Sequence, residues 1–387
     1  MLPQTQALGQ ATSGLQVEIV RDIERFNCLA DEWDRLVHGC LADSVFMSHT
    51  WFRTWWESFG RGNELYIVTV RSRGELVAVA PMMRTHTRIY GFRTAALHAI
   101  YNSHTPRYDF IVADKPDLRL YDAIWQKLNI DDSNCDLIVL PQIPDESRTI
   151  PTIEKLGNRC GWLSGQWTAP VSPFIHLDCD YETFFSGLGD GCRFNLTKRD
   201  ARLRRIGPVD VEVVTDRCDV DQAMLDGLRI EAAAWKGENG TAMISDLRVA
   251  DFYTRLAKRE ADLGQLRLTF LRVAGERVAF TYLLQSASKL YAVKIGYDPR
   301  YHAYSPGNML LNLILKDACH RGVTEYDLLG GDDEWKFEWT KETRGHRWLF
   351  LFKDRFRPRL LHHLKFALVP AAKRWRSIVG AAYGCPH

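Results

Sequence analysis

The sequence lacks any apolar run approaching the ~20 residues that a membrane-spanning helix needs, so no membrane span is expected. Residues 1–14 are polar, and they have neither the basic start nor the apolar stretch of a signal peptide. We therefore expect a cytoplasmic protein in which residues 1–15 form a flexible N-terminus.

Paired cysteines are missing as well. The nine cysteines are odd in number and scattered, and no C-x-x-C pair occurs. This pattern argues against a disulfide framework and against a zinc site. The histidines show no ligand spacing either, so we expect no metal, and reduced thiols are the simplest interpretation of the cysteines.

An excess of charge of one sign is also absent, because the net charge is only +2 over 387 residues. The charge of the whole chain therefore gives no argument for a nucleic-acid partner. Basic residues do gather near the end, where eight stand against one acid: Lys353, Arg355, Arg357, Arg359, Lys365, Lys373, Arg374 and Arg376. Apolar side chains alternate with them, so the tail at 356–387 is basic and amphipathic. It could contact an anionic inner-membrane surface peripherally, dock on the body of the protein, or engage an acidic partner.

What the sequence does contain is an internal repeat. Residues 65–83 align without a gap to residues 266–284, at an offset of 201 (266 − 65). Six positions are identical: Leu65/Leu266, Arg71/Arg272, Gly74/Gly275, Glu75/Glu276, Val77/Val278 and Ala78/Ala279. Each copy has two strand-like runs around a Gly-containing turn, which predicts a β-hairpin.

The segments around the two hairpins follow the same predicted order: helix, helix, hairpin, strand, helix, strand. The helices are expected at 27–37, 48–59 and 117–128 in the first half and at 220–235, 247–263 and 308–321 in the second. A chain of this length suits two domains. We expect an α/β (α+β) fold with domains at 16–168 and 169–355.

This order resembles the GNAT acyltransferase superfamily, and more closely the tandem group that includes CelD-type acetyltransferases and Fem aminoacyltransferases. The resemblance covers residues 17–355 and is carried by FMSHTWFRTWW (46–56), EAAAWKGENGTAM (231–243), YDPRYHAYSPGNMLL (297–311) and EYDLLGGDDEWKFEW (325–339). It implies two GNAT-like domains in tandem, each a mixed, mostly antiparallel sheet flanked by helices. One departure is that the family's R/Q-x-x-G-x-G/A loop corresponds here to YSPGNM (304–309), with a single glycine.

A helix start is expected within that loop. Ser305 is suited to cap the helix, Pro306 to its first turn, and Gly307 to the close approach of a ligand. Free backbone N–H groups at a helix start favour phosphate. With the resemblance, the candidate residues for binding the acyl-CoA co-substrate are Ser305, Gly307, Asn308 and Met309; an ordinary capped helix is the alternative.

The segment after the last predicted strand combines glycines, acids and one lysine. Lys336 stands between Trp335 and Phe337, and inward packing of both rings would hold its stem and direct its ammonium along one face. By resemblance to Fem enzymes, Lys336 faces the acyl donor; otherwise it is a surface charge paired with a nearby acid. Asp327 and Gly331 are expected to contact substrate, and Lys336 and Asp332 are candidate catalytic residues.

Acyl transfer to an amine also needs a proton acceptor. Glu231 is the preferred candidate, and Trp235, four residues later on the same helix face, is expected to contact substrate. Asp327 and Asp332 are rival bases. A salt bridge on a solvated face is the alternative for Glu231.

Residues 193–205 form a basic helix that either contacts an anion or is merely solvated. The resemblance implies transfer of an acetyl or longer acyl group from acyl-CoA to an amine of a small molecule or sugar, including a role in polysaccharide or envelope biosynthesis. The alternatives are a Fem-like transferase that depends on aminoacyl-tRNA and a non-catalytic partner in polysaccharide assembly. Only the first of these alternatives involves nucleic acid.

Overall fold

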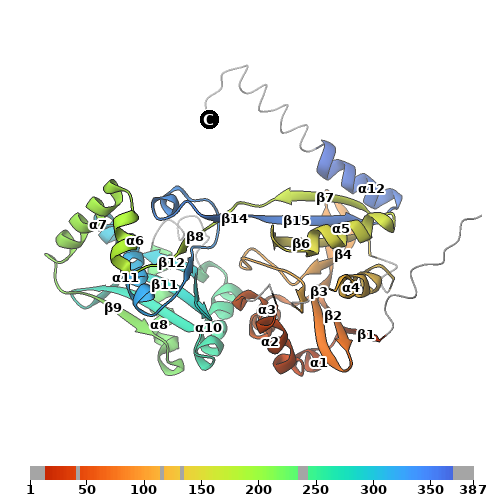
Figure 1. Ribbon diagram of the computed structural model, residues 1–387, viewed down its shortest axis with the longest axis horizontal. Coiled ribbons are helices and arrows are strands. Elements are labelled where there is room, and N and C mark those ends of the chain that lie inside the picture. Colours follow the sequence, from red (N-terminus) through yellow and green to blue (C-terminus); the bar gives the residue numbers. More distant parts are fainter. Residues whose placement is uncertain (1–13, 41–43, 114–116, 131–134, 234–242, 369–387) are drawn as a thin grey trace, which may run out of the picture. The chain divides into compact units, whose positions relative to one another are not determined.

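The computed structural model describes residues 14–40, 44–113, 117–130, 135–233 and 243–368, and they form two compact units (Figure 1). The first unit covers the chain up to residue 49, residues 62–169 and the chain from residue 346 onward. The second covers residues 50–61 and 170–345. The units therefore differ from the expected linear halves, because each receives a segment from the other half of the sequence.

The first unit is built on a sheet with the strand order β1-β2-β3-β4-β6-β15-β7, and β5 pairs with β3. Among the described strands of this unit, only β4 and β6 pair in parallel, over three residues on each strand. The strands are β1 (Leu15–Val20), β2 (Glu64–Ser72), β3 (Glu75–Ile89), β4 (Phe92–Ala99), β5 (Ile111–Val112), β6 (Leu137–Pro144), β7 (Leu163–Thr168) and β15 (His346–Phe352). Its described helices include α1 (Ile23–Asn27), α2 (Ala30–His38), α4 (Leu118–Ile130) and α5 (Thr149–Arg159).

The second unit repeats this plan with the strand order β14-β8-β13-β12-β11-β10-β9. Here β12 and β13 form the parallel pair. The strands are β8 (Ser172–His176), β9 (Val209–Val214), β10 (Leu266–Val273), β11 (Glu276–Ser286), β12 (Lys289–Tyr297), β13 (Glu325–Asp327) and β14 (Thr343–Arg344). Its described helices include α3 (His49–Phe59), α6 (Tyr181–Gly187), α7 (Asp190–Leu203), α8 (Val220–Ala233), α10 (Leu247–Asp262) and α11 (Pro306–His320).

The two predicted hairpins are confirmed and agree in detail. Arg73 and Gly74 turn β2 into β3 with φ of 51° and 86°, and Ala274 and Gly275 turn β10 into β11 with φ of 50° and 87°. Two successive positive φ angles are what a type I′ turn requires. A register shift follows Val70 in the first hairpin and Leu271 in the second, which is the same offset of 201. The repeated geometry, together with the two mixed, mostly antiparallel sheets, bears out the expected tandem fold.

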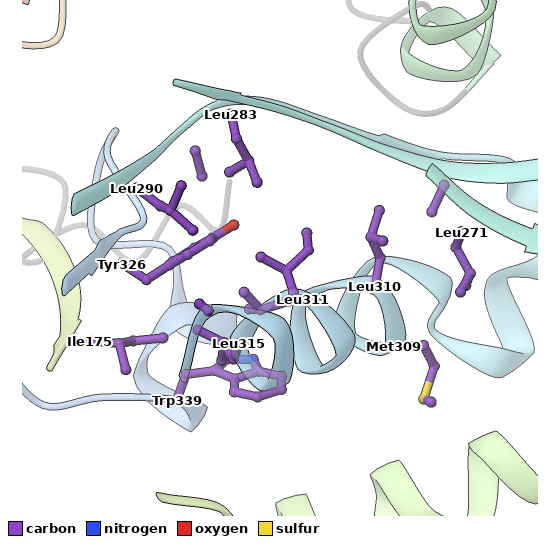
Figure 2. Close-up of a cluster of buried hydrophobic side chains, with 14 of the residues drawn as sticks. Ile175, Leu271, Leu283, Leu290, Met309, Leu310, Leu311, Leu315, Tyr326 and Trp339 are labelled. Atoms are coloured by element: carbon purple, nitrogen blue, oxygen red, sulfur yellow. The ribbon is translucent and has the colours of Figure 1, made fainter. Parts of the chain in front are cut away.

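Helices cover both faces of the second sheet. The helix α11 lies on one face with α6 and α7, while α8 and α10 lie on the other. Figure 2 shows the core between α11 and the sheet, where Leu310 and Leu311 of the helix point toward the strands that carry Leu283 and Leu290. The two faces thus present different surroundings to the end of β12.

The start of the basic tail docks on the first unit. The helix α12 (Phe356–His363) and the π-helix η6 (Leu364–Leu368) follow β15. The His362 Nε2 lies 2.9 Å from the Ser164 carbonyl oxygen. A Cβ on Gly165 would come within 2.4 Å of the Phe366 ring, so these two residues pack directly together. Docking on the body therefore holds for residues 356–368, and the remainder of the tail falls outside the described residues.

Candidate active site

The parallel strands of the second unit part at their carboxyl ends. Lys289, Leu290 and Tyr291 of β12 pair with Glu325, Tyr326 and Asp327 of β13, where β13 ends. The strand β12 continues to Tyr297 and pairs there only with β11 among the described strands. Ligands of open α/β sheets bind beyond the carboxyl ends of parallel strands. The edge of β12 at 292–297 is therefore the natural wall of a ligand site.

The start of α11 lies next to this edge. After β12, the 3-10 helix η4 (Pro299–Tyr304) leads to Ser305, which has φ 48° and ψ 59°. Pro306 begins α11 as predicted, but no hydrogen bond from the side chain of Ser305 caps it. The expectation of a serine cap is wrong, because the left-handed backbone at Ser305 replaces the extended conformation that a capping residue adopts.

The first turn of α11 offers two backbone donors. The Met309 N–H donates to the Ser305 carbonyl oxygen at 3.1 Å, and the Met309 side chain is buried in the core. Gly307 and Asn308 lie within the first turn, where N–H groups have no intrahelical acceptor. A Cβ on Gly307 would meet only the Tyr297 ring, at 3.8 Å, so the approach to the backbone is open. Of the four predicted residues, Gly307 and Asn308 are therefore placed to bind a phosphate.

Lys336 is buried, and its ammonium is held by three oxygens. The Nζ donates to the carbonyl oxygens of Leu329 and Gly331 at 2.8 Å each, and it lies 2.8 Å from the Asp333 carboxylate. Phe337 is exposed, so the two flanking rings do not enclose the lysine as expected. Lys336 therefore fixes the loop after β13 and does not present its charge along a face.

The two aspartates proposed as rival bases differ in their surroundings. Asp327 is fully buried, its Oδ1 accepts from the Leu329 N–H at 2.9 Å, and its Oδ2 accepts from Arg344 at 2.9 Å. Arg344 also bonds the buried Glu325 at 3.2 Å. Asp332 is exposed. Both acids are thus poorly suited as bases, since one is bound in an ion pair and the other is solvated.

Glu231 lies against the outer half of β12. Its side chain is fully buried, and its Oε2 accepts from the Met243 N–H at 2.8 Å. A Cβ on Gly296 would lie 2.8 Å from the Glu231 Cα, so only glycine lets α8 approach the strand this closely. We call the space along β12 at 292–297, where β13 no longer pairs with it, the gap. Glu231 therefore lies beside the gap, on the face of the sheet opposite α11. The expected neighbour Trp235 lies outside the described residues.

The basic helix is α7, and it approaches the same region from the α11 face. The Arg202 guanidinium lies 5.1 Å from the centroid of the Tyr304 ring, directly before the start of α11. Arg193 is paired with Asp190, and Arg204 bonds Asp200 at 2.8 Å. Only part of the positive charge of this helix is therefore available to an anion.

The corresponding place in the first unit lies beyond the end of β4, and a residue of the same unit occupies it. The strand β4 ends at Ala99, and β6 continues beyond their parallel pairing. The fully buried Tyr108 donates its N–H to the Gln142 carbonyl oxygen of β6 at 3.2 Å and its O–H to the Pro81 carbonyl oxygen of β3 at 3.1 Å. One residue thus joins the two strands that flank β4, through its backbone on one side and its side chain on the other, beyond the point where β4 ends.

The comparisons agree with this architecture. The family described as "Acetyltransferase (GNAT) domain" matches residues 191–337, within the second unit, so the GNAT resemblance drawn from the sequence is confirmed for this part of the chain. Acyl transfer is the reaction class of that family. No curated protein matches the chain.

Solved structures resemble the chain over most of its length. The crystal structure of FemX has a TM-score of 0.58 at 12% identity, and the match covers 86% of this chain and 96% of FemX. The C-terminal domain (DUF2156) of a putative lysylphosphatidylglycerol synthetase from Agrobacterium fabrum has a TM-score of 0.51 at 14% identity, with 89% and 96% covered. A conserved protein of unknown function from Bacteroides thetaiotaomicron has a TM-score of 0.53 at 10% identity, with 87% and 100% covered. At these identities the likeness concerns the fold alone.

Proposed function

We propose that the protein is an N-acyltransferase that moves an acetyl or longer acyl group from acyl-CoA to an amine of a small molecule or sugar. The observation that supports this most is the parting of β12 and β13 beside the first turn of α11. A thioester supplies an already activated carbonyl, so the protein has to position it and remove a proton from the amine.

The roles follow from position. The N–H groups of Gly307 and Asn308 would bind a phosphate of the donor on the α11 face. Glu231 would accept the proton of the attacking amine on the α8 face. We assign Lys336 a positioning role, because its ammonium is bonded to the carbonyl oxygens of Leu329 and Gly331 on either side of Gly330.

The donor is tested by thermal unfolding with acetyl-CoA, longer acyl-CoAs, free CoA and an aminoacyl-tRNA in separate samples. A ligand at 100 times its Kd stabilises the folded protein by about 2.7 kcal/mol. We expect a rise in Tm with the thioesters and free CoA. A shift with the aminoacyl-tRNA alone would replace the CoA donor by the Fem-like alternative, and no shift with any donor would contradict the proposal.

A matched pair of variants locates the donor. Gly307→Asp places a carboxylate at the start of α11, and Leu118→Asp places one at the start of α4 in the first unit. Both changes favour the helix dipole by up to about 1 kcal/mol, so neither should lower Tm. We expect Gly307→Asp alone to weaken binding of acetyl-CoA, by about tenfold or more, because it repels the phosphates. Equal affinities in the two variants would remove α11 from the donor site.

A further inference from the structure

Lys294 lies in the part of β12 beyond its pairing with β13, and it faces α8 and α10. In the β11–β12 register it is opposite Tyr282, whose O–H donates to the Tyr253 carbonyl oxygen of α10 at 3.3 Å. Directly opposed residues of antiparallel strands share a face. The half-buried Lys294 carries its ammonium 5.0 Å from the centroid of the Tyr253 ring, within the range of a cation–π interaction.

A β-bulge gives Lys294 this direction. Tyr282 is opposite Lys294 but Leu283 is opposite Ala292, so Val293 is an extra residue. Bulges turn the side chains that follow them to a new face. Ala292 belongs to the core beneath α11, whereas Lys294 lies on the other face. Without the bulge, strict alternation would turn the ammonium toward that apolar core.

Glu231 lies on the same face of β12 as Lys294. A Cβ on Gly296, two residues after Lys294, would lie 2.8 Å from the Glu231 Cα, so α8 brings Glu231 against this end of the strand. Burial, and in addition the negative charge of Glu231, raise the pKa of the Tyr253 hydroxyl. The α8 face of the gap therefore carries one carboxylate, of Glu231, and one ammonium, of Lys294.

This pair of charges constrains the acceptor. An amine attacks as the neutral base, and a nearby lysine ammonium disfavours the protonated form of a second amine. The same ammonium attracts an anionic group. On the basis of the proposed acyl-transfer function, we propose that Lys294 determines acceptor specificity by binding an anionic group, a carboxylate or a phosphate, that lies next to the amine to be acylated.

Acceptor pairs that differ in the anionic group test this proposal. With acetyl-CoA as donor, turnover is measured for L-lysine against cadaverine and for glucosamine 6-phosphate against glucosamine. A charge-assisted hydrogen bond contributes about 1.5–3 kcal/mol, so we expect kcat/KM to favour the anionic member of at least one pair by about 10- to 100-fold. A preference for L-lysine over cadaverine indicates a bound carboxylate, and a preference for glucosamine 6-phosphate over glucosamine indicates a bound phosphate.

Three variants test whether Lys294 causes the preference for the anionic acceptor. Lys294→Gln should reduce the ratio of the two kcat/KM values to below about threefold, through a change in KM. Lys294→Arg should largely retain the ratio. Lys289→Gln, on the same strand with its charge 3.6 Å from Glu325, should leave it unchanged. The proposal is overturned if Lys294→Gln keeps the preference or lowers kcat equally for all acceptors.

Binding measured without a donor separates this proposal from the donor assignment. Thermal shifts of the full chain with each acceptor alone should show the same preference and its loss in Lys294→Gln. A preference in binding without turnover of acetyl-CoA would contradict the CoA donor but support Lys294. No preference in either measurement overturns the role of Lys294.

Discussion

The two units share one plan but treat the same position in opposite ways. In both, a hairpin leads to a strand that pairs in parallel for only three residues before the strands part. In the first unit, Tyr108 bridges the flanking strands beyond that point. In the second, β12 extends past the pairing toward a helix start with two available N–H groups. Two units with the same frame thus differ in what lies beyond the end of the parallel pairing: a bridging residue in the first and a helix start in the second.

The largest expected difference between the units concerns two buried acids. Glu231→Gln should lower turnover by about 100-fold or more, the range typical of losing a general base. The amide oxygen can still accept from the Met243 N–H, so the fold should persist. Asp109→Asn, the same change at a buried acid of the first unit, should leave kcat nearly unchanged. Comparable losses in steady-state assays of both variants would show that the first unit also takes part in the chemistry.

The next largest effect concerns the loop after β13. Lys336→Met removes an ammonium bonded to two carbonyl oxygens and paired with Asp333, and leaves these acceptors without their donor. We expect a loss of about 3 kcal/mol in the free energy of unfolding, measured by urea denaturation. Lys353→Met in the first unit, where the ammonium lies 5.5 Å from the centroid of the Trp162 ring, is the comparison variant. If Lys336→Met kept full stability but lost turnover, Lys336 would act on substrate directly.

An effect of similar or smaller size is the pH dependence of stability that one acid of the first unit, Asp109, contributes. Burial raises the pKa of Asp109 from 3.8 to about 6. The folded protein then keeps a proton that the unfolded chain releases between about pH 4 and pH 6, so the free energy of unfolding falls as pH rises through this window. The change amounts to at most about 3 kcal/mol and levels off above pH 6. Subtracting the urea stability of Asp109→Asn from that of the wild type at several pH values isolates it, and a flat difference would contradict the raised pKa.

Local patterns made much of this architecture predictable. The hairpin turns at Gly74 and Gly275 and the start of α11 at Pro306 follow from turn chemistry and periodicity within a few residues. Glu231 lies on a predicted helix and Gly307 at a predicted helix start, and the structure has both residues beside the gap. The long pairing of β15 with β6 and β7 was not predicted, because a strand's partners depend on distant segments.

The orientation of the candidate Lys336 was mispredicted and Lys294 was not predicted at all, in both cases for geometric reasons. Alternation of Trp335, Lys336 and Phe337 suggested that the two rings share a face, but Glu334–Glu338 forms a 3-10 helix, in which the period is three and the lysine turns inward. Lys294 was hidden because the register shift at Val293 reverses which residues of the strand face α8. A bulge of this kind has no signal in the residue pattern of β12 itself.

The position of β15 has a consequence for the order of folding. This strand supplies the pairing that β6 and β7 need, about 200 residues after β6 in the chain. During synthesis, the N-terminal segments of the first unit therefore emerge long before their last partner, whereas residues 170–345 of the second unit emerge together. The second unit can complete its sheet first, and the half-finished first unit leaves the backbone edges of β6 and β7 that pair with β15 unpaired until residue 352 leaves the ribosome.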